Sequence, residues 1–133
     1  MINIKILWVE DDPNFSRSVL LRLRNELLQM KVEIEEEKLK DGNYVWETVR
    51  DWKPDIIMMD HNLENVQTNG ALLVLEIVFV QNHDETPIIF YSSAMDEKLV
   101  NLVSNANNVS PTGRDEVHTE LLLTVKKIVA ANS

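Results

Sequence analysis

The chain has 133 residues, of which 44% are hydrophobic and 26% charged, a composition typical of one globular domain rather than of a disordered chain. Its 22 acidic and 13 basic residues give a net charge of −9, which disfavours direct binding of nucleic acid because phosphate backbones attract Lys and Arg. Cysteine is absent, and this excludes disulfides and thiolate metal sites.

Nothing in the chain has the pattern of a targeting or membrane segment. The first residues run directly into strand-like sequence, so we expect no separate signal peptide. The longest apolar stretch, residues 71–80, is interrupted by Glu76 and is too short to cross a bilayer. These patterns favour a cytoplasmic protein that does not bind membranes.

Strand-like and helix-like stretches alternate along the whole chain. In order, they are a strand at residues 4–9, a helix at 15–30, a strand at 32–35, a helix at 44–52, a strand at 56–59, a helix at 70–80, a strand at 87–91, a helix that begins after Asp96, a very short strand near Val109 and a helix at 117–129. Unbroken apolar runs mark buried strands, and apolar residues at every third or fourth position mark helices. The alternation predicts a single α/β domain with a five-stranded parallel sheet and helices on both faces.

Carboxylates follow two of these predicted strands. Glu10, Asp11 and Asp12 come directly after the first strand, and Asp60 comes directly after the third. If the two strands are neighbours, as in the doubly wound strand order 2-1-3-4-5, Glu10, Asp11 and Asp60 converge at one edge of the sheet. Carboxylates that close repel one another, and an all-oxygen site of this kind suits Mg²⁺. The simpler alternatives are acids that stabilise a helix N-terminus and a turn-forming Asp60.

The fourth predicted strand brings Ser92 and Ser93 to the same edge of the sheet. A hydroxyl group there is placed to donate a hydrogen bond to an oxyanion on Asp60. On its own the pair is uninformative, because Ser commonly follows strands in turns.

The ordered combination resembles the receiver domain of bacterial two-component response regulators. The matching segments are residues 6–13 (ILWVEDDP), 54–60 (PDIIMMD) and 86–93 (TPIIFYSS), with Asp41-Gly42 where the family usually has such a pair. The likeness covers residues 4–129. It implies a flavodoxin-like fold with strand order 2-1-3-4-5, and one receiver domain over residues 1–133 with no residues left for an output domain.

The resemblance also implies a mechanism. Asp60 is the expected phosphoacceptor, taking a phosphoryl group from a phosphohistidine. Mg²⁺ is expected on Glu10, Asp11, Asp60 and the backbone carbonyl of Asn62. Ser92 is the expected switch hydroxyl that contacts the phosphoryl group. Such a chain is a signalling phosphoacceptor with at most slow self-dephosphorylation, and we do not expect a turnover enzyme.

Partners follow from the same resemblance. They are a sensor histidine kinase or a phosphotransfer protein upstream, and a downstream protein or an output domain. A partner or a homodimer contact is expected on the face around the fourth and fifth helices.

The match fails at one functional position. The family's phosphate-contacting lysine follows the fifth strand, but here the candidate positions hold Ser110 and Thr112, and no lysine occurs between Lys98 and Lys126. Arg114 is the nearest cation that could replace it. In the loop after Asp60, the family's usual proline is replaced by Glu64, and Gly70 falls about two residues late.

Three other functions are alternatives to a phosphoacceptor receiver. A degenerate pseudo-receiver, acting as a phosphorylation-independent protein-binding module, is favoured by the missing lysine and opposed by Glu10, Asp11, Asp60 and Ser92. An FMN-binding flavodoxin is disfavoured because three acids after the first strand would repel the phosphate of the flavin. An aspartyl phosphatase would need its nucleophile after the first strand and a second acid two residues on, a pattern that residues 10–13 do not resemble.

Histidines and tryptophans near these motifs have simpler interpretations. His61 is predicted to face solvent at the rim of the site, and His83 and His118 to lie in a loop and on a helix surface. Trp8 is predicted to pack in the core.

Overall fold

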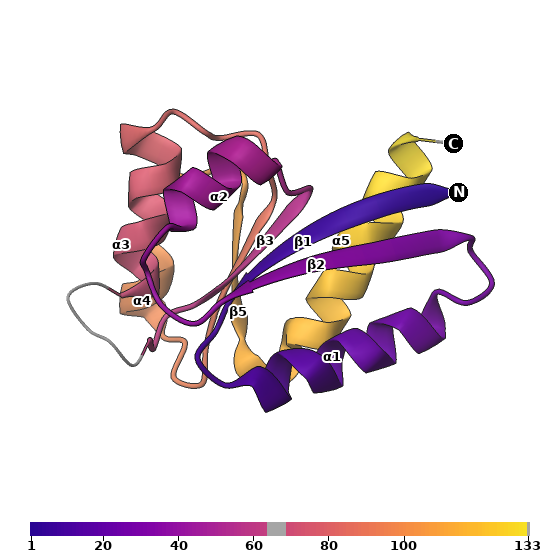
Figure 1. Cartoon of the computed structure of the whole chain (residues 1–133). Helices are drawn as coiled ribbons and strands as arrows, with labels where there is room; N and C mark the ends of the chain where they lie inside the picture. Colours follow the sequence, from indigo (N-terminus) through magenta and orange to yellow (C-terminus); the bar gives the residue numbers. More distant parts are fainter. Residues whose placement is uncertain (64–68, 133) are drawn as a thin grey trace.

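Five parallel strands form one sheet in the order β2-β1-β3-β4-β5, with helices on both of its faces (Figure 1). The computed structural model describes residues 1–63 and 69–132. Its elements are β1 (Ile2–Val9), α1 (Pro13–Glu26), β2 (Val32–Leu39), α2 (Val45–Trp52), β3 (Ile56–Asp60), α3 (Gly70–Leu75), the π-helical turn η1 (Glu76–Val80), β4 (Ile88–Ser92), α4 (Glu97–Leu102), β5 (Val109–Gly113), the 3₁₀ turn η2 (Arg114–Glu116) and α5 (Val117–Ala131). The predicted fold class and strand order are confirmed.

The sheet separates two hydrophobic clusters, because successive side chains of a strand point to opposite faces. On one face Ile4, Ile6 and Trp8 of β1 pack with α1 and α5. On the other face Leu7 and Val9 pack with α2, α3, η1 and α4. All five of these β1 side chains are fully buried, so β1 is a central strand that fixes the position of the residues after Val9.

Capping residues begin the helices close to where the sequence predicts. The Asp12 carboxylate accepts a hydrogen bond from the backbone N–H of Asn14, and Pro13 lies in the first turn. The Asp96 carboxylate accepts one from the backbone N–H of Leu99 and caps α4. Asp12 and Asp96 therefore determine where α1 and α4 begin.

Several predicted boundaries are wrong. α1 ends at Glu26 rather than near residue 30, and β5 has five residues rather than being very short. The predicted helix at 70–80 changes to π-helical geometry after Leu75, where the N–H of Gln81 bonds to the carbonyl of Glu76. Residues 64–68 of the predicted polar loop, including Glu64, lie outside the described residues.

Two predictions about histidine exposure are corrected. His118 is buried rather than on the helix surface, because α5 packs against α1 and places Nε2 of His118 3.5 Å from Oε1 of Glu26. This burial lowers the pKa of His118. His61 is half-buried, with its ring 5.6 Å from that of Phe90 in an edge-to-face contact.

No helix within the described residues has the length and apolar character needed to cross a membrane. The parallel register places the carboxyl ends of β1, β3 and β4 at one edge, with Val9 beside Met59 and Asp60 beside Tyr91. That edge carries the polar residues that the sequence singles out.

Candidate functional site

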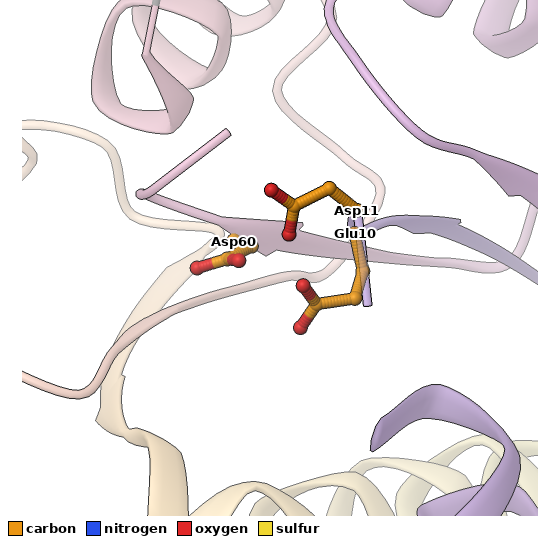
Figure 2. A group of neighbouring side chains, drawn as sticks. All are labelled: Glu10, Asp11 and Asp60. Carbon is orange, nitrogen blue, oxygen red and sulfur yellow. The ribbon is translucent and has the colours of Figure 1, made fainter. Parts of the chain in front are cut away.

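Three carboxylates gather where β1 and β3 end (Figure 2). Glu10 and Asp11 follow β1, Asp60 is the last residue of β3, and one carboxylate oxygen from each lies within 4.8 Å of the others. Glu10 and Asp60 are buried, whereas Asp11 is half-buried. The predicted convergence of these side chains is confirmed, and it follows from β1 and β3 being neighbours in the sheet.

Burial and mutual repulsion make it costly to ionise the two inner carboxyl groups. Burial is the largest influence on Glu10 and, together with Asp60, raises its pKa from 4.5 to about 8. Burial also raises the pKa of Asp60, while the Glu10 side chain, the N–H of Asn62 and the Arg114 guanidinium act to lower it. Burial therefore disfavours the ionised form of both groups, and a cation close to them would favour it.

Asn62 and Ser92 lie beside Asp60. The backbone N–H of Asn62 donates to Oδ1 of Asp60 at 3.1 Å, and the Asn62 side-chain amide donates to Oγ of Ser92 at 3.3 Å. Ser92 is buried at the end of β4, and its Oγ also accepts from the N–H of Ala94. Asn62 thus connects the carboxylate of Asp60 to the hydroxyl of Ser92.

Arg114, which the sequence identifies only as the cation nearest to the position of the family's lysine, lies among the acidic side chains. Its Nη1 is 3.1 Å from Oε1 of Glu10 and 3.7 Å from Oδ2 of Asp60, and its Nη2 is 3.7 Å from Oδ2 of Asp12. The residue begins η2, directly after β5. Thr112, at the position counted for the family's lysine, is buried and donates instead to the carbonyl of Ser110.

Trp8 and Tyr91 form a hydrogen-bond network with Glu10 that the sequence did not predict. The indole N–H of Trp8 donates to the Tyr91 hydroxyl at 2.7 Å, and that hydroxyl donates to Oε1 of Glu10 at 2.9 Å. Both aromatic residues are fully buried. The sequence did give one indication of this network. Trp8 and Glu10 are two residues apart, so their side chains lie on the same side of an extended chain.

Gly70 lies against the backbone at the end of β3. A Cβ atom on Gly70 would come within 2.1 Å of the Asp60 carbonyl oxygen and 2.7 Å of the His61 Cα. The N–H of Gly70 donates to the carbonyl of His61, so the start of α3 is joined to the segment that carries Asp60. The sequence showed Gly70 only as the start of a helix, because this close approach comes from the tertiary packing.

An open cavity of about 650 Å³ adjoins Glu10 and Asp11. Its lining includes apolar and aromatic groups (Trp8, Pro13, Leu39 and Tyr44) and two lysines (Lys38 and Lys40). This cavity leaves one side of the acidic group accessible from outside the domain.

The chemistry of the donor set fits a hard divalent cation. Carboxylate oxygens are the ligands that Mg²⁺ prefers, and three of them face a common space here. A divalent charge would also offset the burial and the neighbouring Asp60 that raise the pKa of Glu10. Glu10, Asp11 and Asp60 are therefore the described residues suited to hold such an ion.

The chain is similar to known proteins in its fold, although not in its sequence. No protein-family model matches the chain, and no curated protein matches it. Solved receiver domains do match along nearly all of it. The signal receiver domain of a DNA-binding response regulator (merR) from Colwellia psychrerythraea matches with a TM-score of 0.74 and 20% identity, covering 96% of this chain and 98% of that one.

Two further structures give the same result. A Francisella response regulator receiver domain matches with a TM-score of 0.68 and 17% identity, covering 98% of this chain and all of that one. The phosphorylated cyanobacterial phytochrome response regulator RcpA matches with a TM-score of 0.70 and 22% identity, covering 95% of this chain and 91% of that one. The chain has the receiver-domain fold.

Proposed function

We propose that this chain is the receiver domain of a two-component response regulator and that Asp60 is its phosphoacceptor. The observation that carries the proposal is the convergence of Glu10, Asp11 and Asp60 within 4.8 Å at the carboxyl edge of a receiver fold. One of the similar solved structures is described as that of a phosphorylated response regulator, which supports the same chemistry here.

In the proposed reaction, an oxygen of the Asp60 carboxylate attacks the phosphorus of a phosphohistidine on a partner protein. The new P–O bond makes an acyl phosphate, the P–N bond breaks, and the departing imidazole keeps the electron pair and takes a proton from solvent. The nucleophile must be ionised. The backbone N–H of Asn62 and the Arg114 guanidinium favour that form of Asp60.

Glu10, Asp11, Asp60 and the backbone carbonyl of Asn62 would hold Mg²⁺. When bound, the ion supplies positive charge that offsets the charge of the transferring phosphoryl group. The residues of the chain would do the positioning. Tyr91 fixes the Glu10 carboxyl group, and Gly70 allows α3 to pack against the strand end that carries Asp60.

Two side chains would respond to the new charge on Asp60. Ser92 would give up its contact with Asn62 and donate its hydroxyl to a phosphoryl oxygen. Arg114 would pair with another phosphoryl oxygen, in the role of the family's lysine. Since Ser92 also accepts from the N–H of Ala94, its movement would reach the segment before α4.

The partners proposed are a histidine kinase or phosphotransfer protein upstream, and a downstream protein or an output domain, in the cytoplasm. The face around α4 and α5 is the proposed surface for the downstream partner or a homodimer. Its exposed apolar side chains support that role: Val100 and Leu102 on α4 and Leu123 on α5. Slow loss of the phosphoryl group would reset the switch, so the chain would signal rather than turn over a substrate.

The second candidate function is a pseudo-receiver that binds protein partners without phosphorylation. The specific observation in its favour is that Arg114 already pairs with Glu10 and Asp60, which supplies positive charge without an added ion. The two candidates differ in one measurable property, which is formation of a covalent phosphoryl adduct on Asp60.

Intact-protein mass spectrometry after incubation with MgCl₂ and a small phosphodonor tests the choice. We expect one phosphoryl adduct in the wild-type chain and in Asp84→Asn, which alters an exposed aspartate in the loop before β4, and none in Asp60→Asn or in EDTA. If folded wild-type protein that binds Mg²⁺ gives no adduct with either a small donor or a panel of phosphorylated histidine kinases, the pseudo-receiver is the correct assignment.

A further inference from the structure

Arg114 lies closer to Glu10, a proposed metal ligand, than to Asp60, the proposed nucleophile. Nη1 is 3.1 Å from Oε1 of Glu10 but 3.7 Å from Oδ2 of Asp60. Since the attraction between opposite charges weakens with distance, Glu10 is the main ion-pair partner of the guanidinium. Arg114 is thus bound to the same carboxyl group that Mg²⁺ would need.

Two aromatic rings and a second acid hold the guanidinium in this place. Its central carbon lies 3.9 Å from the centre of the Phe15 ring and 5.9 Å from that of Tyr91. Nη2 also lies 3.7 Å from the carboxylate of Asp12, which caps α1. Arginine stacks well on aromatic faces, so Phe15 and Asp12 can hold the guanidinium independently of Glu10 and Asp60.

An ion and the guanidinium cannot share Glu10 without cost. Mg²⁺ binds carboxylate oxygens at about 2.0–2.1 Å in near-octahedral geometry and keeps several waters around it. Nη1 lies 3.1 Å from Oε1 of Glu10, within the space that the ion and its waters would take up beside that oxygen. The two positive charges would also repel each other at this short separation.

We propose that Arg114 is a built-in counter-ion that competes with a divalent cation for Glu10 and Asp60, and that metal binding releases the guanidinium from these two carboxylates while it keeps its contacts with Phe15 and Asp12. This inference rests on the proposed metal site. It adds a property of this chain, which is a metal affinity limited by its own arginine. It also explains how Arg114 can neutralise the carboxylates before the ion binds and pair with the phosphoryl group once Asp60 carries it.

Calorimetric titration with MgCl₂ tests the competition. We expect Arg114→Ala and Arg114→Gln to bind Mg²⁺ at least about fivefold more tightly than the wild-type chain, the lower end of ordinary coupling between two bound groups. Arg114→Lys keeps the charge and should stay nearer to wild type. Arg50→Ala is the matched control, because Arg50 is also ion-paired, with Asp51, but lies on the exposed surface of α2.

Thermal unfolding gives a second, independent measurement. In EDTA, Arg114→Ala should melt at a lower temperature than wild type, since two buried carboxyl groups lose their counter-ion. Saturating MgCl₂ should raise the melting temperature of Arg114→Ala by more than that of wild type, because a ligand stabilises by its affinity for the folded state. Arg114→Gln supplies the same comparison if the alanine variant does not fold in EDTA.

Equal or weaker Mg²⁺ binding by Arg114→Ala and Arg114→Gln would overturn the inference, since the guanidinium would then be neutral or helpful to the metal. Absence of Mg²⁺ binding in every variant would overturn it together with the proposed metal site. The phosphoacceptor assignment is tested separately by mass spectrometry. Unchanged metal affinity in a chain that still forms the Asp60 adduct would reject the competition alone.

Discussion

The Tyr91 hydroxyl donates a hydrogen bond of 2.9 Å to Oε1 of Glu10 while accepting one of 2.7 Å from the indole of Trp8. This chain of bonds anchors the most strongly perturbed carboxyl group of the site to the hydrophobic core between the sheet, α1 and α5. The position of Glu10 is therefore set by buried residues rather than by the loop in which it lies.

Tyr91→Phe should lower the free energy of unfolding by about 1–3 kcal/mol, because it leaves the buried Trp8 N–H without its acceptor. Tyr44→Phe is the matched control, since Tyr44 is 74% exposed and should change stability by less than about 0.5 kcal/mol. Urea denaturation followed by far-UV circular dichroism measures both. Equal effects of the two substitutions would show that the network does not stabilise the fold.

Gly70→Ala should be among the most damaging single substitutions. The added Cβ would overlap the backbone carbonyl of Asp60, and relief requires α3 or the end of β3 to move, at an expected cost of about 3 kcal/mol or more. Gly113→Ala is the matched control. Its Cβ would meet only the Asp115 carboxylate at 3.9 Å, and its φ of −70° suits alanine.

Gly113→Ala should therefore be neutral or stabilise by up to about 1 kcal/mol through the unfolded state. Thermal and urea unfolding of the two variants provide the comparison. A mild effect of Gly70→Ala would mean that α3 can withdraw from β3 at little cost, contrary to the packing described.

Stability in EDTA should fall as the pH rises. The pKa of Glu10 is raised from 4.5 to about 8 in the folded chain, chiefly by burial, so the folded state binds this proton more tightly than the unfolded state. The stabilisation is fully present below about pH 4.5 and is lost as the pH rises through about 8. Asp60 contributes in the same direction, because its pKa is raised too.

We expect Glu10→Gln to flatten this profile and saturating MgCl₂ to reverse it, because the ion favours the ionised carboxylates. Urea denaturation at a series of pH values between about pH 5 and pH 9 makes the measurement. Parallel profiles for wild type and Glu10→Gln would show that Glu10 is not the titrating group.

Ser92→Ala should slow the gain of the phosphoryl group by Asp60 and remove the response of α4, since the buried hydroxyl would no longer reach a phosphoryl oxygen. A loss of roughly tenfold in rate corresponds to one ordinary hydrogen bond to a charged group. Ser93→Ala is the matched control, because Ser93 is the neighbouring exposed serine. Time-resolved mass spectrometry gives the rates, and equal rates for the two variants would exclude a role for Ser92 in the transfer.

The sequence alone determined the order of the elements and the convergence of the acids. Strand and helix patterns alternate, a parallel sheet brings all carboxyl ends to one edge, and Glu10 and Asp60 follow buried strands. These features depend on local periodicity and on one topological rule, so they are readable without coordinates. Whether Asp60 accepts a phosphoryl group stays a prediction.

Only the tertiary structure decided what surrounds the acids. Arg114 reaches Glu10 because β5 ends at Gly113 beside Ser92 of β4, which brings the next residue to the edge of the sheet that carries the acids, and no residue pattern at 114–116 predicted that contact. The Tyr91 bond to Glu10, the contact of Gly70 with β3 and the burial of His118 likewise join residues far apart in the chain. Such contacts are fixed by the packing of whole elements, because the direction of a side chain beyond a strand end depends on which neighbours leave it room.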